Sequence, residues 1–152
     1  MATQTQQNEK DVQYLNSFLK NELSAVETYN QCIEKADSPD ISSSLTTLQQ
    51  SHRKRAQLLT DRIQALGGSP ASGSGMWGSV AKLVQGSANL FGEKSAVSTL
   101  EEGEDRGRDD YQRDVSKLSP ENRQFIEQEI MPEQQRSHDT MHAIEKQVKQ
   151  LH

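Results

Sequence analysis

Hydrophobic side chains recur at alternating steps of three and four residues along most of this chain, which is the spacing of the buried face of an amphipathic helix. A serine-proline pair, which suits the first turn of a helix, opens two of these stretches, and a pair of glycines ends one of them. Pro132 lies inside the last stretch and is expected to kink that helix or shift its register. The pattern therefore predicts an all-α protein with four long helices, over residues 11–36, 39–66, 96–117 and 120–151.

The two halves of the chain repeat one another. A glutamate stands 17 residues before the helix-starting proline of the first half and 16 residues before that of the second, and a tyrosine stands 10 and 9 residues before them. Beyond the prolines the agreement is poorer, because His52 follows its proline by 13 residues and His138 by 18. The repeat indicates two helical hairpins of similar design.

Residues 67–95 join the two predicted hairpins and are far longer than the roughly two to eight residues that usually connect neighbouring helices of a bundle. Apolar residues within 76–91 are spaced as on a short helix. Such a crossover would make the second and third helices parallel, which is an up-down-down-up layout. A flexible linker between separate hairpins is the alternative, and whether 76–91 covers its own bundle or contacts a partner is left open.

Composition and charge narrow the class of protein. Of 152 residues, 32% are hydrophobic and 5% aromatic, so we expect a single domain of solvated helices over residues 11–152, preceded by a disordered polar tail over residues 1–10. The net charge of −5 argues against nucleic acid, and no stretch approaches the roughly 18 apolar residues of a membrane span. We expect a cytoplasmic protein that binds neither nucleic acid nor membrane; a homodimer is left open, and no protein partner can be named.

Polar side chains interrupt the apolar face of every predicted helix. These candidate site residues are Glu22, His52, Glu104 and His138. A buried charge is costly unless a metal, a hydrogen-bond network or a neighbouring cation such as Arg55 compensates it. Two carboxylates and two imidazoles, one from each helix, are donors that suit iron, manganese or zinc. One hypothesis is therefore that these side chains bind one divalent metal. The alternatives are a buried hydrogen-bond network without metal, and carboxylates that reach solvent.

The chain resembles an uncharacterised bacterial family of the ferritin-like superfamily, catalogued as domain of unknown function 2383. The resemblance rests on the stretches LNSFLKNELSAVETY (15–29), SHRKRAQLLTDRIQALGGSP (51–70), GSGMWGSVAKLVQGSANLFG (73–92) and LEEGEDRGRDDY (100–111). It implies a ferritin-like four-helix bundle in which a long crossover joins two antiparallel hairpins, and it implies no particular reaction. Dinuclear metal bundles of this superfamily carry a glutamate on each of two helices and Glu-x-x-His on each of the other two.

This chain departs from that metal pattern, because glutamine stands three residues before both candidate histidines, at Gln49 and Gln135. Glutamine is neutral and bridges two cations poorly, so Glu22 and Glu104 would neutralise one divalent metal but not two. The sequence therefore favours a mononuclear site or none. The favoured function is a non-catalytic structural, stress-related or interaction protein; the alternative is a ferritin-like oxidase or metal-handling protein, so whether the chain is an enzyme is left open.

Overall fold

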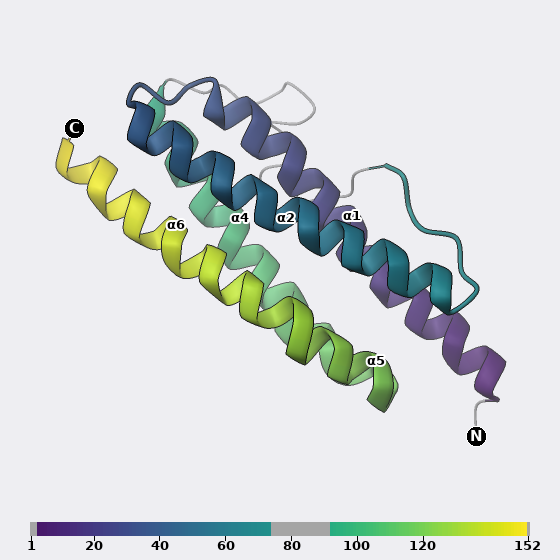
Figure 1. The fold of residues 1–152 in the computed structure, drawn as a ribbon. Helices are drawn as coiled ribbons and strands as arrows, with labels where there is room; N and C mark the ends of the chain where they lie inside the picture. The colour runs from purple at the N-terminus through teal and green to yellow at the C-terminus, as the bar shows by residue number, and fades with distance from the viewer. Residues whose placement is uncertain (1–2, 74–91, 152) are drawn as a thin grey trace.

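The computed structural model describes residues 3–73 and 92–151. Four long helical segments lie side by side (Figure 1). The last of them is continuous from residue 120 to residue 151, although its helical geometry changes along its length. The elements are α1 (Gln4–Ile33), α2 (Pro39–Ala65), α4 (Glu93–Asp114), a 3₁₀ turn (Val115–Lys117), α5 (Pro120–Phe125), a π-helical turn (Ile126–Ile130) and α6 (Met131–Leu151).

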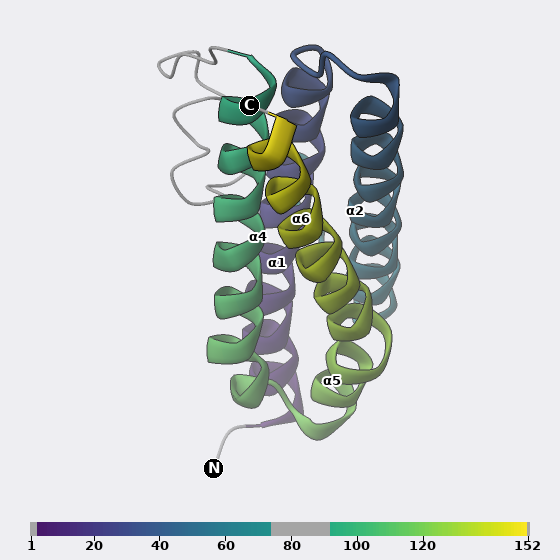
Figure 2. The same cartoon turned by 90° about the vertical axis from the view of Figure 1, so that its left-hand side faces the viewer.

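The four segments form two antiparallel hairpins. Helix α1 packs mainly against α2, and α4 packs mainly against α6, while α1 and α4 connect the hairpins (Figure 2). Helices α2 and α4 run in the same direction, which confirms the predicted four-helix bundle with an up-down-down-up layout. The short helix predicted within residues 76–91 lies outside the described residues.

Both ends of α2 follow from local sequence. The Ser38 hydroxyl accepts a 3.1 Å hydrogen bond from the backbone of the first turn, and Pro39 occupies the first helical position, where its missing N–H costs nothing. After the last turn, Gly67 adopts a φ of +81°, which favours glycine. At Gly68 a Cβ atom would lie 2.8 Å from a Val12 methyl group, so the hairpin packs closely only because no side chain is present there.

Helix α1 begins earlier than the sequence predicted. Residues 4–10, predicted to be a disordered tail, form its first two turns. Thr3 and Gln6 form a capping box, in which each side chain accepts a hydrogen bond from the other residue's backbone N–H. The turns carry few apolar residues, so the hydrophobic spacing contained no signal for them. Asp11, one residue beyond them, is buried.

Two buried acids cap helix starts of the opposite hairpin. Asp11 of α1 accepts hydrogen bonds from Ser119 N (3.2 Å), from the Ser119 hydroxyl and from Asn122 Nδ2 (2.6 Å) at the start of α5. Glu93 of α4 accepts bonds of 2.7 and 3.1 Å from the backbone N–H groups of residues 37 and 38 at the start of α2. Each acid therefore ties its own hairpin to the other one.

Replacing Asp11 with alanine is expected to lower the free energy of unfolding by about 1–3 kcal/mol, because it leaves the half-buried donors of Ser119 and the buried amide of Asn122 unpaired. Urea unfolding of the variant and the wild type measures the difference. Glu9→Ala, two residues away on the exposed side of α1, is the matched control and should change stability by less than about 0.5 kcal/mol. Equal effects at both positions would contradict a capping role for Asp11.

The π-helical turn sets the register of the fourth segment. In it the Met131 N–H donates to the carbonyl of Ile126, five residues back, and Pro132, which has no N–H to donate, follows directly. The turn adds one residue to the second half of the repeat. The helix-starting prolines Pro39 and Pro120 lie 81 residues apart. From Ile130 onward, each residue that corresponds to a buried residue of α2 lies 82 residues after it. The predicted register shift near Pro132 is therefore present, just before the proline.

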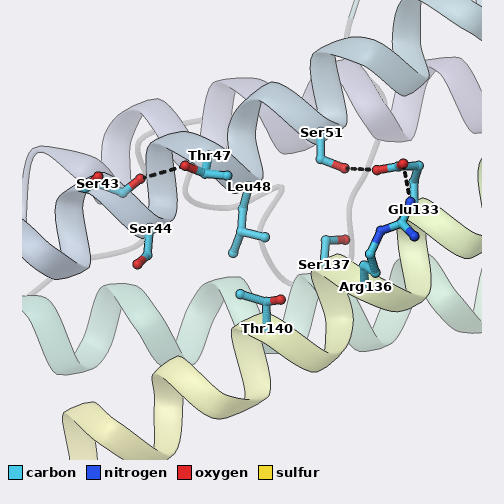
Figure 3. Close-up of a pocket in the computed structure, with 9 residues that line it drawn as sticks. All are labelled: Ser43, Ser44, Thr47, Leu48, Ser51, Glu133, Arg136, Ser137 and Thr140. Atoms are coloured by element: carbon cyan, nitrogen blue, oxygen red, sulfur yellow. Dashed lines mark hydrogen bonds and ion pairs between the residues drawn. The ribbon is translucent and has the colours of Figure 1, made fainter.

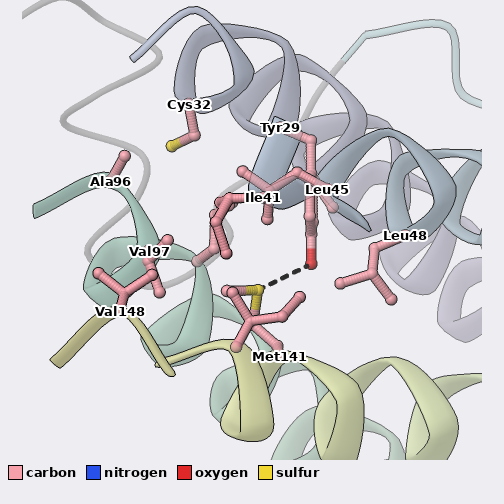
Figure 4. Packing of buried hydrophobic residues seen from close by; sticks show 12 residues of the cluster. Tyr29, Cys32, Ile41, Leu45, Leu48, Ala96, Val97, Met141 and Val148 are labelled. Atoms are coloured by element: carbon pink, nitrogen blue, oxygen red, sulfur yellow. Dashed lines mark hydrogen bonds between the residues drawn. The ribbon is translucent and has the colours of Figure 1, made fainter. Parts of the chain in front are cut away.

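The apolar core consists of two clusters, one toward each end of the bundle. Figure 4 shows the first, where Tyr29 points from α1 toward Met141 of α6 with its hydroxyl 3.8 Å from the sulfur. The second contains Phe18 and Tyr111, whose ring centroids are 4.6 Å apart. Within the described ranges, no helix combines the length and the apolar character needed to cross a lipid bilayer.

Candidate functional site

A layer of charged and polar side chains separates the two apolar clusters. It receives at least one residue from every long helix, and all its members are at most 3% exposed. We call it the ionic layer; its residues are Glu22 of α1, His52 and Arg55 of α2, Glu104 of α4 and Ser137 of α6. Side chains of this kind are almost never fully buried unless they pair with one another.

His52 lies between the two carboxylates. Its Nδ1 atom is 3.0 Å from Glu22 Oε1, and its Nε2 atom is 2.7 Å from Glu104 Oε1. Burial and the nearby Arg55 charge lower the pKa of the imidazole, but Glu104 and Glu22 raise it by more, so the pKa lies above its usual value. When the ring is protonated, both nitrogens donate, one to each carboxylate; in the neutral ring, Nε2–H donates to Glu104 and Nδ1 accepts from the Arg55 guanidinium at 2.9 Å.

Arg55 supplies the second positive charge. Its Nε atom lies 2.9 Å from Glu22 Oε2 as an ion pair, although the Nε–H itself points to the Ser51 carbonyl at 3.4 Å. Nη2 donates to the Ser137 hydroxyl at 3.1 Å and lies 2.9 Å from His52 Nδ1. Burial lowers the pKa of the guanidinium, but the two carboxylates raise it by more, so Arg55 is charged. Nη1 has no hydrogen-bond partner in the described part of the chain.

Glu104 receives the largest set of hydrogen bonds in the layer. Besides His52, the Tyr29 hydroxyl donates to it at 2.6 Å and the Ser137 hydroxyl at 2.9 Å. Burial raises the pKa of this carboxyl, but the charge and hydrogen bond of His52, followed by Arg55, lower it to about 2. Glu104 is therefore ionised at neutral pH. With His52 protonated, two anions face two cations and the ionic layer is neutral as a whole.

These pKa shifts predict that stability is greatest between about pH 4.5 and pH 6.5, the usual pKa values of Glu and His. The contribution of Glu104 is complete above pH 4.5 and is lost as the pH falls toward 2. The contribution of His52 is complete below pH 6.5 and is lost as the pH rises through the raised pKa of the folded state. Urea unfolding from pH 3 to pH 9 measures the profile. His52→Gln should remove the alkaline decline; an unchanged decline would contradict the assignment to His52.

The structure brings together three of the four residues that the sequence singled out, namely Glu22, His52 and Glu104. The fourth, His138, lies apart from them at the surface between α4 and α6. Its Nε2 atom is 2.6 Å from Asp105 Oδ1 and 3.0 Å from Arg108 Nη1, and neither of these residues belongs to the ionic layer. The prediction that His138 points into the core is therefore corrected. The physical reason is helical spacing: the buried positions along the last helical segment run from Ile130 through Gln134 and Ser137 to Met141, and His138 lies at the edge of that face.

The two glutamines that precede the candidate histidines are also not members of the ionic layer. Gln49 donates to the Val26 carbonyl at 2.9 Å and so connects α2 to α1, while Gln135 is exposed. The residues of α6 that face inward are Gln134 and Ser137. From the sequence, Arg55 was expected only as a neighbouring cation and Ser137 was not among the candidates, although both lie on the same helix faces as other inward residues.

The repeat explains which residues correspond. Residues of the layer in the first half have counterparts 82 residues later; this offset holds for α1 and α4 before the π-helical turn, and the turn restores it for α2 and α6. The pairs are Glu22 with Glu104, His52 with Gln134, and Arg55 with Ser137. Each half thus contributes one glutamate and two side chains spaced three residues apart on one helix face. The first half supplies both positive charges, and the second supplies an uncharged amide and a hydroxyl.

The donor set of the layer does not fit a dinuclear carboxylate centre. Such a centre needs four carboxylates and two imidazoles, whereas only two carboxylates and one imidazole are present, and both nitrogens of His52 already face carboxylates. A guanidinium cannot ligate a cation. As the side chains lie, no three His, Cys, Asp or Glu residues among those that the structure describes converge to hold a metal ion.

A groove of about 330 Å³ runs between α2 and α6 and leads toward the ionic layer (Figure 3). Ser137 lies at its inner side and connects it to Glu104 and Arg55. Six of its nine lining residues carry a hydroxyl group; the nine are Ser43, Ser44, Thr47, Leu48, Ser51, Glu133, Arg136, Ser137 and Thr140. These nine residues include neither histidine nor cysteine, so the groove offers no nucleophile with an adjacent imidazole base.

Comparison with known proteins agrees with the observed fold. Residues 10–117 match the family described as domain of unknown function 2383 (DUF2383). The chain is also similar to the crystal structure of ferritin like, diiron-carboxylate proteins from Bacillus anthracis str. Ames, with a TM-score of 0.62, 13% identity and 99% of each chain covered. At this identity the similarity establishes the fold alone. No curated protein matches the chain.

Proposed function

The chain belongs to the DUF2383 family and has a ferritin-like fold, and from this premise we propose that it is a non-catalytic structural or interaction protein whose core contains an ionic layer instead of a metal centre. One observation supports the proposal above others. Glu22 and Glu104, the two carboxylates that a metal would need, are already bound by Arg55 and His52 of the same chain.

A structural role agrees with the way the layer connects the helices. Glu22 of α1 pairs with α2, Glu104 of α4 pairs with α2, and Ser137 of α6 contacts both α2 and α4. Apolar clusters alone tolerate small shifts of one helix along another, whereas directional ion pairs tolerate only one register. Buried polar groups can specify register in this way, sometimes at a cost in stability. We propose that the ionic layer fixes how the two hairpins dock.

Elemental analysis tests this proposal. Untagged wild-type protein, purified without chelator from cells supplied with iron, manganese and zinc, is expected to contain far less than one metal ion per chain, because its own cations already neutralise the layer. Glu22→Gln removes a carboxylate from the layer, and His142→Ala removes an exposed imidazole at the surface, so the two variants separate core binding from surface binding. Near-stoichiometric metal that is lost in Glu22→Gln but retained in His142→Ala would overturn the proposal and favour a metal-handling protein.

A further inference from the structure

We infer that this bundle retains the complete six-position framework of a dinuclear metal centre, in which Arg55 and His52 take the place of the metal ions, and that exchanging four side chains converts the layer into a metal site. This inference goes beyond the proposed function. It concerns what the backbone framework of this chain can hold, whereas the proposed function concerns what the wild-type side chains do.

The positions of the layer match the framework. Dinuclear bundles take one glutamate from each of two helices and a pair of ligands three residues apart from each of the other two. Here α1 and α4 supply the single glutamates, and the inward pairs spaced three apart lie on α2 and α6. All six positions are at most 3% exposed: Glu22, His52, Arg55, Glu104, Gln134 and Ser137. The pairs on α2 and α6 differ from Glu-x-x-His at every position, reading His-x-x-Arg and Gln-x-x-Ser.

The guanidinium of Arg55 lies where these positions meet. Its Nε atom is 2.9 Å from Glu22 of α1, and its Nη2 atom is 2.9 Å from His52 Nδ1 and 3.1 Å from the Ser137 hydroxyl of α6. One cationic group thus contacts framework positions on three helices. Nη1 has no hydrogen-bond partner among the described residues, so charge, more than a complete set of hydrogen bonds, holds the group there.

Charge balance explains why a dinuclear metal centre and the arrangement with Arg55 and His52 exclude one another. In a dinuclear centre, four carboxylates balance two divalent cations. In this layer, two carboxylates face the Arg55 guanidinium and the His52 ring, which together balance them when the ring is protonated. Either set is neutral, whereas a mixture of the two leaves uncompensated buried charge. The exchange therefore has to be made as a set: His52→Glu, Arg55→His, Gln134→Glu and Ser137→His.

The test compares this fourfold variant with the wild type under anaerobic loading with Co²⁺, Zn²⁺ or Fe²⁺. The fourfold variant is expected to bind about two metal ions per chain, to unfold at a higher temperature when loaded, and to show the visible absorption of protein-bound cobalt; the wild type should show none of these. A matched control, Gln49→Glu with Gln135→Glu, creates Glu-x-x-His twice in the sequence but places both new carboxylates outside the layer, and should not acquire a dinuclear site.

Arg55→His alone provides a second test that does not require four exchanges. It removes the resident cation and leaves both carboxylates with two imidazoles, so about one divalent metal per chain is expected. If either variant is unfolded without metal, metal-induced recovery of far-UV circular dichroism is the readout. No effect of metal on either variant, or equal binding by the Gln49→Glu, Gln135→Glu control, would overturn the inference. Metal in the wild-type layer would instead overturn the proposed function, so the two failures are distinguishable.

Discussion

Replacing Arg55 with methionine is expected to lower the free energy of unfolding by about 3–5 kcal/mol, the largest loss we expect from any single substitution in the layer. Methionine has a similar length and fills much of the same space, so the packing loss is small. The cost arises because Glu22 loses its ion pair at 2.9 Å while it stays buried, and because Ser137 loses a charged donor.

Chemical denaturation of Arg55→Met measures this loss, and Arg53→Met, on the exposed side of the same helix, is the matched control with an expected change within about 0.5 kcal/mol. A double-mutant cycle adds a second check. In a Glu22→Gln background the Arg55→Met substitution should cost clearly less, because the partner charge is already absent. Equal costs in both backgrounds would show that Arg55 contributes packing and not charge.

Replacing all four charged residues of the layer together is expected to change the free energy of unfolding in the opposite direction from Arg55→Met. The combination Glu22→Leu, His52→Leu, Arg55→Met and Glu104→Leu should leave the protein as stable as the wild type or more stable by up to about 4 kcal/mol. Ionic groups lose hydration when they are buried, and their mutual attraction repays that loss incompletely. Apolar side chains of similar volume would instead join the two clusters into one continuous core.

The same denaturation experiment measures the combined variant, and a two-dimensional NMR spectrum reports whether it still adopts one conformation. We expect stability to be retained but the hairpin register to be less well defined, with broadened or doubled resonances, because the directional pairs are gone. A combined variant less stable than Arg55→Met alone would contradict the account, since it would mean that the ions themselves stabilise the fold by more than their burial costs.

The sequence predicted the architecture well, because the hydrophobic spacing and the helix-ending residues are local signals. Serine-proline starts and the glycine pair marked the ends of α2 and the start of α5 to within a residue or two. Glu22, His52 and Glu104 were found for the same reason, since each interrupts an otherwise apolar face. The first turns of α1 were missed because a capping box, and no apolar spacing, begins that helix.

The remaining members of the site could not be read from the sequence because they depend on register. The π-helical turn at Ile126–Ile130 adds one residue, and no local pattern distinguishes it from a regular helix before Pro132. His138 was chosen as the counterpart of His52, although the spacing from Ile130 to Met141 puts it at the edge of the buried face; the structure places Gln134 and Ser137 in the core. Arg55 was likewise underestimated, because a long cationic side chain next to apolar residues more often reaches solvent than the core.

The central claim is that Arg55 and His52 of this chain, and not a metal, balance Glu22 and Glu104, and the protonation of His52 tests it most directly. Nitrogen-15 NMR of the histidine rings, with His52 assigned by its loss in His52→Gln, should show more than half of the His52 rings protonated at both nitrogens at pH 6.5, where an unperturbed imidazole is only half charged. A neutral His52 ring at that pH, or a ring nitrogen shifted by a bound metal ion, would contradict the account.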